Sequence, residues 1–292
     1  MKIRNKNDLP QALVNAISIS QHNKEGCYSA TTLLHGVREI LLTKRHWNEI
    51  EVDVEDCIWQ IFGTAVHLVM EKAPDNTFKE EYFEVPVSKS KLTGQIDCYD
   101  MEHELIIDWK TASVWKIKYN NFDDWQKQGM LYAYLLHENG LSAKYCEFIA
   151  LLKDYSQAEA NRNNKYPQSK CYKYGFTVTP EDIEITKNYV LKKIKMIEEC
   201  TGLMDDELPV CSKEERWADD EKWAVMKEGR KSAIKVCNDE KTAQDMAERL
   251  GSRHYVQYRP AVSRKCEGYC ICKDFCSFYN NQIKSKEIRN EN

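Results

Sequence analysis

The sequence predicts an α/β (α+β) chain, and three observations lead to that prediction. Residues 55–72 carry apolar side chains at a helical period, and residues 124–137 do so again. Between these two stretches, residues 82–87, 92–99 and 104–111 alternate or run apolar with strand-forming side chains. A helix, three successive strands and a second helix therefore form the predicted centre of the chain.

The first helix is expected to be buried, because apolar side chains cover most of its circumference. Its few polar residues form one stripe, since they recur at intervals of three or four: Gln60, Thr64, His67 and Glu71. A polar stripe on a buried helix needs a polar partner. His67 and Glu71 are therefore candidate metal ligands, and the alternative is a structural histidine with ordinary hydrogen bonds.

The three strands are expected to form an antiparallel meander, because the polar residues 100–103 suit a hairpin turn. In the third strand Asp108 and Lys110 lie two residues apart, so their side chains share one face, while Trp109 points into packing on the other. Asp97 lies near the end of the second strand. The turn is therefore expected to bring its carboxylate close to that of Asp108.

Two clustered aspartates predict a site for a hard cation such as Mg²⁺ or Mn²⁺, which prefer oxygen ligands. An ammonium beside such an ion can orient a water molecule or stabilise charge that develops on phosphorus. Asp97, Asp108 and Lys110 are thus candidate catalytic residues, and both aspartates are candidate metal ligands with His67 and Glu71. The alternative is that these charges are the solvent-facing side of a half-exposed hairpin.

The second helix offers two further candidates. Gln128 and Tyr132 lie one helical turn apart, so both polar tips can face the same cleft, unless they are an incidental part of an aromatic helix face. Gly140 stands just past the predicted helix end. The elements expected after it are a buried strand at 146–152, a loop at 154–173, a short strand at 174–178 and an amphipathic helix at 181–200.

A small ββαβ module is expected after the core. Its predicted elements are strands at 223–227 and 232–237, a helix at 241–250 and a strand at 254–259. The predicted domains are accordingly a core at 1–208, an accessory region with a cysteine cluster at 209–280 and a polar tail at 281–292.

Composition limits the class of protein. With 42% hydrophobic and 30% charged residues, the chain reads as globular, and no apolar run approaches the roughly 20 residues that span a bilayer. We therefore expect a cytoplasmic protein with no membrane association. The net charge of −4 neither indicates nor excludes a nucleic-acid partner, because local Lys and Arg density decides phosphate binding. No GxxxxGK[ST] motif is present, so the chain lacks this signature of an ATP-driven motor.

Four of the 12 cysteines fall within eleven residues near the C-terminus: Cys266, Cys270, Cys272 and Cys276. The others are scattered, as is typical of reduced cysteines that pack as small apolar side chains. Four clustered thiols favour a bound metal or cluster. A local four-thiolate zinc site that includes Cys272 is one arrangement, and unliganded thiols are the alternative.

Four short patterns in order resemble the RecB-like branch of the PD-(D/E)XK nuclease superfamily, over roughly residues 29–155. They are Gly63-x-x-x-His67, Gly94-Gln95-Ile96-Asp97, Ile107-Asp108-Trp109-Lys110-Thr111 and Gln128-x-x-x-Tyr132. Ile96 stands where the nominal motif has proline. Ser29–Leu34 with the run to Trp47 also resembles an N-terminal element of phage-encoded relatives.

The resemblance implies a central mixed β-sheet flanked by helices, a restriction-endonuclease-like core. It implies that His67, Asp97 and Asp108 bind Mg or Mn, that Lys110 assists catalysis, and that Gln128 and Tyr132 lie beside the active site. The expected activity is a DNA nuclease, most simply an exonuclease in recombination, repair or phage replication. Expected partners are DNA and a helicase or recombination protein, with a toroidal oligomer also compatible, in a bacterial or phage-infected cell. The rival expectation is a non-catalytic nucleic-acid-binding or assembly module.

The cysteines add a second resemblance. Some RecB-like nucleases hold a 4Fe-4S cluster with three C-terminal cysteines and one upstream cysteine, and Cys266, Cys270 and Cys276 are similar to that trio. The first spacing is three residues rather than two. Cys211 is the expected fourth ligand, although the family's upstream cysteine usually precedes the core.

Overall fold

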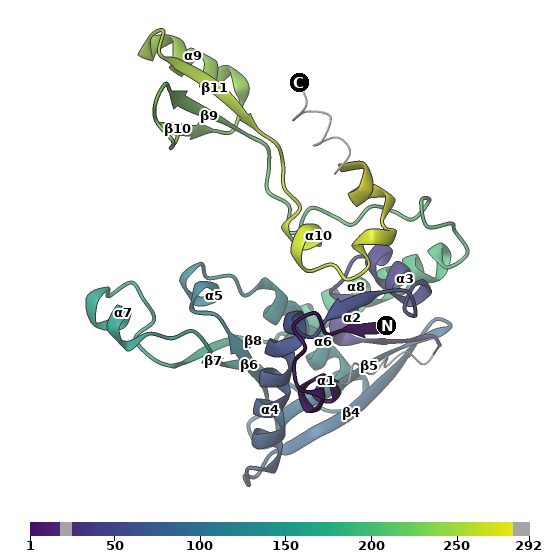
Figure 1. The fold of residues 1–292 in the computed structure, drawn as a ribbon. Coiled ribbons are helices and arrows are strands. Elements are labelled where there is room, and N and C mark those ends of the chain that lie inside the picture. Colours follow the sequence, from purple (N-terminus) through teal and green to yellow (C-terminus); the bar gives the residue numbers. More distant parts are fainter. Residues whose placement is uncertain (18–24, 283–292) are drawn as a thin grey trace. The chain divides into compact units, whose positions relative to one another are not determined.

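The computed structural model describes residues 1–17 and 25–282, and the chain divides into two compact units, Met1–Leu203 and Met204–Asn292 (Figure 1). The predicted boundary at residue 208 lies close to this division. Residues 283–292, most of the predicted polar tail, lie outside the described residues.

The first unit contains these elements in chain order: β1 (Lys2–Arg4), α1 (Gln11–Ala16), β2 (Cys27–Ser29), α2 (Ala30–Leu33), α3 (Val37–Arg45), β3 (Glu51–Asp53), η1 (Glu55–Cys57), α4 (Ile58–Lys72), β4 (Phe78–Val87), β5 (Ser90–Asp100), β6 (Leu105–Ala112), α5 (Val114–Lys118), α6 (Asp123–Glu138), β7 (Tyr145–Leu152), α7 (Gln157–Arg162), β8 (Cys171–Thr177) and α8 (Pro180–Cys200). The predicted loop at 154–173 is therefore interrupted by α7, and the strand after it begins earlier than expected.

A six-stranded mixed sheet forms the centre of this unit, with helices packed against it, so the predicted fold class is confirmed. Its strands follow the order β2-β5-β6-β7-β8, and β4 pairs with β5. The predicted meander is present, because β4, β5 and β6 pair antiparallel in succession (Figure 1). The β6 and β7 strands are parallel, which makes the sheet mixed.

The sheet forks at β5. The start of β5 pairs parallel with β2 through Lys91–Thr93, and its end pairs antiparallel with β6 through Cys98–Asp100. Between these two ladders, none of the described strands pairs with the segment 94–97 on that edge. Side chains and backbone groups from other elements can therefore enter the sheet at this gap.

Local sequence explains where the flanking helices begin and end. Thr179 and Asp182 form a reciprocal capping box at the start of α8, and Pro180 occupies the first helical position. Beyond the end of α6, Gly140 adopts φ +77°, a left-handed conformation that glycine tolerates without a steric penalty. This confirms the predicted helix stop.

The core lies where α6 and α8 cover the sheet. Ile96 and Ile106 from the meander, Phe148 from β7, Leu135 from α6 and Ile194 from α8 are all essentially inaccessible to solvent. Gly94 permits the close approach of α6, since a Cβ there would lie 2.5 Å from Leu135 Cδ1. This packing fixes α6 directly beneath the fork of the sheet.

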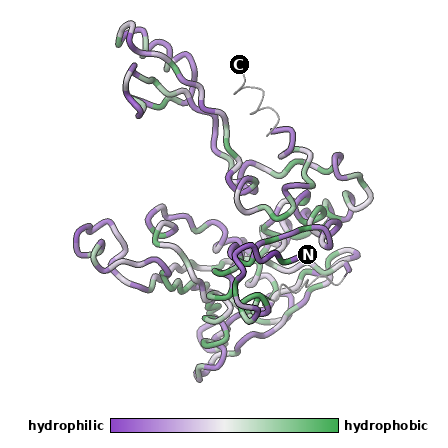
Figure 2. Tube along the Cα trace, viewed as in Figure 1, coloured by the Kyte–Doolittle hydropathy of each residue, from purple (hydrophilic) through white to green (hydrophobic). Residues whose placement is uncertain are grey.

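The expectation that α4 is a buried helix is wrong. None of its residues is fully buried, and Trp59, Phe62, Leu68 and Val69 are 42% to 64% exposed. Figure 2 shows the hydrophobic, green stretches of this helix. Only one side of α4 faces the sheet, where a Cβ at Gly63 would lie 3.6 Å from Thr111 Oγ1. Apolar composition alone does not tell which sides of a helix find partners.

The second unit contains β9 (Lys222–Lys227), β10 (Lys235–Cys237), α9 (Glu240–Leu250), β11 (His254–Arg259), α10 (Arg264–Gly268) and η2 (Lys273–Phe275). The predicted ββαβ pattern is present as a three-stranded antiparallel sheet of order β10-β9-β11, with β10 shorter than expected. Helix α9 packs on this sheet through Ala243 and Ala247, which join Val225 and Cys237 in a small core.

Across the described residues, no helix is both long enough and apolar enough to cross a bilayer.

Candidate active site

The fork of the sheet positions the two aspartates. Asp97 ends the segment of β5 that lies between the β2 and β6 ladders, and its Oδ2 accepts a hydrogen bond from the Trp109 backbone N–H at 2.8 Å. The carboxylate thus satisfies a β6 donor at the place where the two strands diverge. Asp97 is buried, at 8% exposure, so its side chain points into the molecule rather than to solvent.

Asp108 is the most deeply buried charge of the site, at 1% exposure. Its Oδ2 accepts a hydrogen bond from Gln128 Nε2 at 3.1 Å. Its Oδ1 receives no hydrogen bond of acceptable geometry from the described residues, although the Lys110 ammonium contacts it as an ion pair. One carboxylate oxygen therefore retains capacity for a further ligand.

Lys110 lies beside Asp108 on the same face of β6, as predicted from their spacing. Its side chain is about one-fifth exposed, and its ammonium also lies 5.5 Å from the Phe148 ring centroid. Trp109 points to the opposite face, where its Nε1 donates to Cys98 Sγ at 3.4 Å. The ammonium is thereby held at the edge of the site with access to solvent.

Helix α4 brings His67 to the same place. His67 Nδ1 lies 3.2 Å from Asp97 Oδ2, and the helix end is held by Lys79, whose ammonium donates to the Met70 carbonyl at 3.1 Å and to that of Ala73. The predicted polar partner of the helix stripe is thus Asp97. This hydrogen bond raises the pKa of His67, and burial opposes it.

Glu80 is a potential ligand that the sequence analysis missed. It lies opposite Asp97 in the β4–β5 register, since Lys79 pairs with Cys98 and Glu81 pairs with Ile96. It adopts φ +53°, a left-handed conformation that is uncommon for a non-glycine residue. Burial raises the pKa of its carboxyl, and the nearby Asp97 charge raises it further.

The donor atoms of His67, Glu80 and Asp97 all lie within 4.8 Å of one another. One imidazole and two carboxylates from three different elements therefore converge on one point. Glu71, the other candidate on the helix stripe, is exposed and is not part of this group. An imidazole with carboxylates suits divalent ions such as Mn²⁺, and carboxylates suit Mg²⁺.

Gln128 and Tyr132 complete the buried side of the site. Gln128 Nε2 donates to the Tyr132 hydroxyl at 2.9 Å as well as to Asp108, and both side chains are buried. The structure thus brings this predicted pair against the predicted carboxylate. Burial, followed by the Asp108 charge, raises the pKa of Tyr132, so its hydroxyl stays neutral.

Electrostatics in this cluster disfavour three bare carboxylates. Burial raises the pKa of Asp108 to about 6; the Lys110 charge acts against this shift, and the Asp97 charge adds to it. Lys110 offsets the charge of one carboxylate, and the remaining like charges disfavour their ionised forms. A divalent cation would supply that counter-charge, which is why the group fits a metal site better than an ordinary ion-pair network.

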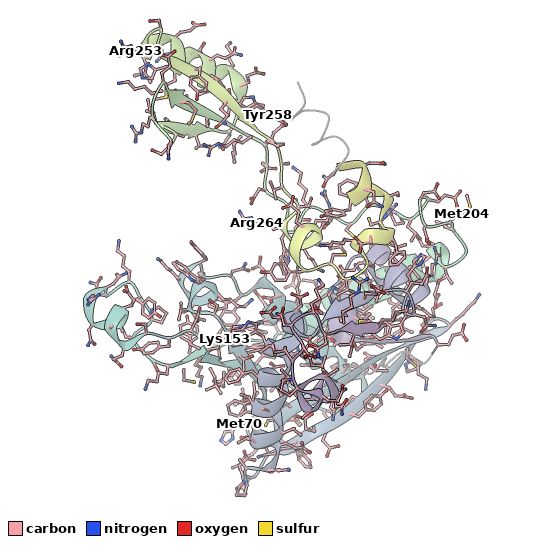
Figure 3. All side chains as sticks on the ribbon, in the orientation of Figure 1. Met70, Lys153, Met204, Arg253, Tyr258 and Arg264 are labelled. Carbon is pink, nitrogen blue, oxygen red and sulfur yellow. The ribbon has the colours of Figure 1, made fainter. Side chains whose placement is uncertain are left out.

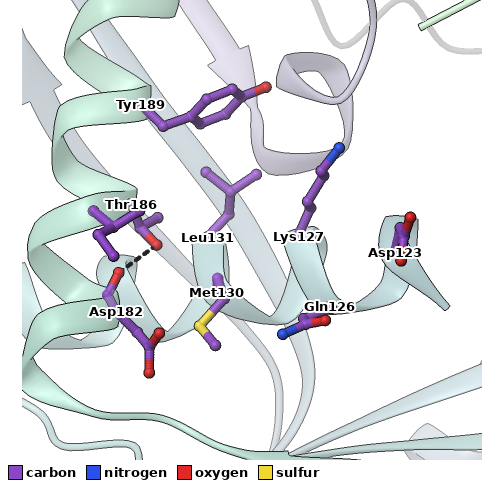
Figure 4. A pocket seen from close by; sticks show the side chains of 9 residues that line it. Asp123, Gln126, Lys127, Met130, Leu131, Asp182, Thr186 and Tyr189 are labelled. Carbon is purple, nitrogen blue, oxygen red and sulfur yellow. Dashed lines mark hydrogen bonds between the residues drawn. The ribbon is translucent and has the colours of Figure 1, made fainter. Parts of the chain in front are cut away.

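A cavity of about 360 Å³ lies elsewhere, between α6 and α8. Figure 4 shows its lining side chains, which include Lys127, Met130 and Tyr189. At 100° per residue, Gln128 and Tyr132 project from roughly the opposite side of α6. The cavity is therefore separate from the candidate active site.

The cysteine predictions concern the second unit. Cys266, Cys272 and Cys276 are buried, and Cys211 and Cys270 are partly buried. The Cys270 and Cys272 sulfurs lie 3.6 Å apart. The Cys211 carbonyl accepts a hydrogen bond from Arg216 Nε at 2.8 Å, which holds that segment in place.

No protein-family model matches the chain, and no curated protein matches it. Among solved structures, the crystal structure of SSO0001 is 16% identical, with 71% of this chain and 87% of that chain covered and a TM-score of 0.42. The alkaline exonuclease LHK-Exo from Laribacter hongkongensis is 9% identical, with 60% and 89% covered and a TM-score of 0.38. A phage-related exonuclease from Haemophilus somnus 129PT is 14% identical, with 56% and 79% covered and a TM-score of 0.35. At these values the likeness assigns no activity to this chain.

Proposed function

We propose that the chain is a metal-dependent DNA nuclease of the PD-(D/E)XK type. The observation that carries the proposal is the convergence of His67, Glu80 and Asp97 within 4.8 Å, beside the buried Asp108 and the Lys110 ammonium. These side chains come from α4, β4, β5 and β6. The ordered motifs of the sequence support the same assignment.

In this proposal Mg²⁺ or Mn²⁺ is held by His67, Asp97 and Asp108, the predicted ligands, with Glu80 as an addition from the structure. When bound, such an ion lowers the pKa of water and neutralises charge on a scissile phosphate. Asp108 Oδ1, which receives no hydrogen bond among the described residues and is contacted only by the Lys110 ammonium, supports a role of this carboxylate as a ligand. Glu71 remains a predicted ligand that would act through water.

The chain's own residues then have distinct tasks. The Lys110 ammonium, fixed by its ion pair with Asp108, stabilises negative charge that develops on the phosphate and orients the attacking water. Gln128 holds the second oxygen of Asp108, so the carboxylate cannot rotate away. Tyr132 accepts from the same amide group and fixes its orientation. Gln128 and Tyr132 are positioning residues.

The test compares wild type with Lys110→Ala on labelled linear, circular and single-stranded DNA with Mn²⁺. Loss of an electrostatic donor of this kind typically lowers the rate about 10²- to 10³-fold. Lys144→Ala is the matched control, because Lys144 is an exposed lysine paired with Glu104 away from the site. A Mn²⁺-dependent rise in melting temperature of both variants separates lost catalysis from lost metal binding.

Undiminished cleavage by Lys110→Ala would remove the catalytic assignment. If wild type cleaves none of the three DNA forms, the alternative applies: a non-catalytic nucleic-acid-binding or assembly module. Cleavage that needs a free DNA end would establish the exonuclease mode. The partner helicase or recombination protein and an oligomeric ring remain proposals, which copurification and mass measurement of the native assembly address.

We also propose that the C-terminal cysteines bind a metal or cluster. Cys266, Cys270 and Cys276 with Cys211 would hold a 4Fe-4S cluster, as the sequence resemblance implies. The 3.6 Å between the Cys270 and Cys272 sulfurs instead suits two thiolates that share one tetrahedral zinc, which lie about 3.8 Å apart at a Zn–S length of about 2.3 Å. Anaerobic purification decides: visible absorbance with bound iron supports the cluster, stoichiometric zinc supports the shared ion, and metal-free protein rejects both.

A further inference from the structure

A strip of aromatic and lysine side chains leads away from the candidate active site. It consists of Trp59, Lys153, Trp115, Lys118 and Tyr119, which we call the aromatic–lysine strip. We propose that this strip binds single-stranded DNA next to the cleavage site, with bases stacked on its rings. The proposal rests on the nuclease function proposed above, and it adds a strand preference.

Trp59 connects the strip to the active site. Trp59, Gly63 and His67 are four residues apart in succession, so they lie along one side of α4. Gly63 faces Thr111, the residue after Lys110, and His67 faces Asp97. Trp59 is therefore about 12 Å from His67 along the helix axis, at 1.5 Å per residue.

The Trp59 ring is both exposed and held in place. It is 57% exposed, and Phe62 packs edge-on against it with ring centroids 6.4 Å apart at 87°. The Lys153 ammonium lies 4.1 Å from the Trp59 ring centroid. An exposed aromatic ring beside an ammonium group is the combination on which the bases and backbone of a nucleic-acid strand bind.

Lys153 joins Trp59 to the next aromatic pair. It directly follows β7 (Figure 3). Its backbone N–H donates to the Ala112 carbonyl at the end of β6. The neighbouring Asp154 accepts hydrogen bonds from Ser113 Oγ at 2.6 Å and from the Val114 N–H at 2.7 Å. The start of α5 is thereby anchored beside Lys153.

Helix α5 repeats the pairing of rings and lysines. Trp115 and Tyr119 are 51% and 71% exposed and stack with centroids 5.9 Å apart, and the Lys118 ammonium lies 4.4 Å from the Trp115 ring centroid. The nearby acidic groups are already engaged: Asp154 caps α5, and Asp124 pairs with Lys116. Within the described part of the chain, neither Lys118 nor Lys153 forms an ion pair with a carboxylate, so both ammonium groups can neutralise phosphates.

Single-stranded rather than duplex DNA is the occupant that these features favour. Rings stack on base faces, which are hidden in a duplex, and lysines neutralise the backbone without reading sequence. The distance of about 12 Å between His67 and Trp59 along the helix axis corresponds to about three to four nucleotides of a stacked strand, whose bases lie about 3.4 Å apart. An extended strand would cover this distance with fewer nucleotides. Stacking at Trp59 would hold one strand in line with the metal site.

The test measures binding of a fluorescent single-stranded oligonucleotide to the full chain in Ca²⁺ or EDTA, without cleavage. Trp59→Ala and Trp115→Ala are expected to raise the dissociation constant about 5- to 150-fold each, the range for loss of one base–aromatic stack. Lys153→Gln should reduce the salt dependence of binding. Duplex binding should change far less, and circular dichroism checks that each variant is folded.

Tyr145→Ala is the matched control. Tyr145 is 49% exposed at the start of β7, about 26 Å from Lys153 along the strand at 3.3 Å per residue. Wild type should bind an oligonucleotide with abasic sites more weakly than an intact one. This loss of affinity should equal the loss that Trp59→Ala or Trp115→Ala causes with the intact oligonucleotide.

Each outcome decides one claim. Equal affinity of wild type and Trp59→Ala for single strands would overturn the strip while cleavage by wild type still supports the nuclease. Wild type that cleaves duplex DNA but does not bind single strands would overturn it as well. Tryptophan-dependent binding by a chain that never cleaves DNA would support the strip and overturn the nuclease.

Discussion

Replacement of Asp108 by asparagine is expected to stabilise the metal-free protein. Asp108 is 1% exposed, and burial, opposed by Lys110 and reinforced by Asp97, raises its pKa to about 6 from 3.8. The folded state thus binds a proton more tightly than the unfolded state. The contribution of Asp108 to the free energy of unfolding therefore falls as the pH rises from about 4 to about 6, and it stays low above that range.

The magnitude follows from the two pKa values. The difference between about 6 and 3.8 corresponds to about 3 kcal/mol at neutral pH, at 1.36 kcal/mol per pH unit. Asparagine keeps an oxygen that can accept from Gln128 but carries no charge. Lys110 loses its ion pair, yet its side chain is about one-fifth exposed and water can reach it. We expect a gain of about 1–3 kcal/mol at pH 8 and roughly half of that at pH 5.

Denaturant melts of the full chain in EDTA measure this difference, and Mg²⁺ should reverse it. Wild type gains RT ln(1 + [L]/Kd), about 2.7 kcal/mol when the ion is present at 100 times its dissociation constant. The Asp108→Asn variant should gain much less, because it lacks a ligand. The transition that responds to Mg²⁺ in wild type identifies the unit that holds the site, since the chain has two compact units.

Two results would refute this reasoning. A variant less stable than wild type in EDTA at pH 8 would mean that Asp108 is stabilised in its charged form, so burial is not the dominant effect. An equal response of both proteins to Mg²⁺ would mean that Asp108 does not bind the ion. Asp124→Asn is the control, because Asp124 is an exposed carboxylate paired with Lys116 and should change stability little.

Three further predictions concern the same region. Gln128→Ala leaves the buried Asp108 and Tyr132 without their shared donor, and denaturant melts should show a loss of about 1–3 kcal/mol; an unchanged midpoint would contradict it. Gly94→Ala would place a Cβ 2.5 Å from Leu135 Cδ1 and should lower the free energy of unfolding by about 1–3 kcal/mol. An unchanged midpoint in denaturant melts would contradict this, because α6 would then have shifted at no cost. Mg²⁺ binding near pH 6 should displace a proton from Asp108, so calorimetry in two buffers should show proton release and tighter binding at pH 7.5; equal affinity at pH 5.5 and 7.5 would disprove it.

The central part of the site was predictable because it depends on short-range geometry. Asp108 and Lys110 share a face by the two-residue period of a strand, and a tight turn brings Asp97 back to them. Gln128 and Tyr132 are related by one helical turn. These relations need only the type of each element and the order of the elements.

Glu80 was missed because it depends on hairpin register. The β4–β5 hairpin turns at Ser88, where φ is +57°, and Val87 pairs with Ser90. A two-residue loop recognised there would have placed Glu80 opposite Asp97. The strand was instead expected to begin at residue 82, so Glu80 lay outside it.

The fork at β5 and the exposure of α4 were beyond prediction for a different reason. Strand β2 is three residues long and pairs with a segment more than sixty residues away, so its own sequence carries almost no signal. Burial of α4 depends on which neighbouring elements cover it. An apolar side chain such as Trp59 or Leu68 predicts a core position whether or not such a neighbour is present. Long-range packing, rather than periodicity, decides both features.

The carboxylate of Asp97 has a structural role besides its proposed role as a metal ligand. It accepts a hydrogen bond from the backbone N–H of Trp109 where β5 and β6 diverge. A descendant of this chain without the proposed nuclease activity would still need an oxygen acceptor at that position to bind the Trp109 N–H. Among the described contacts, the Lys110 side chain makes no hydrogen bond to the backbone; its ammonium contacts the side chains of Asp108 and Phe148. Among relatives, the lysine would therefore disappear before the aspartate does, and its presence is the better sign of a working enzyme.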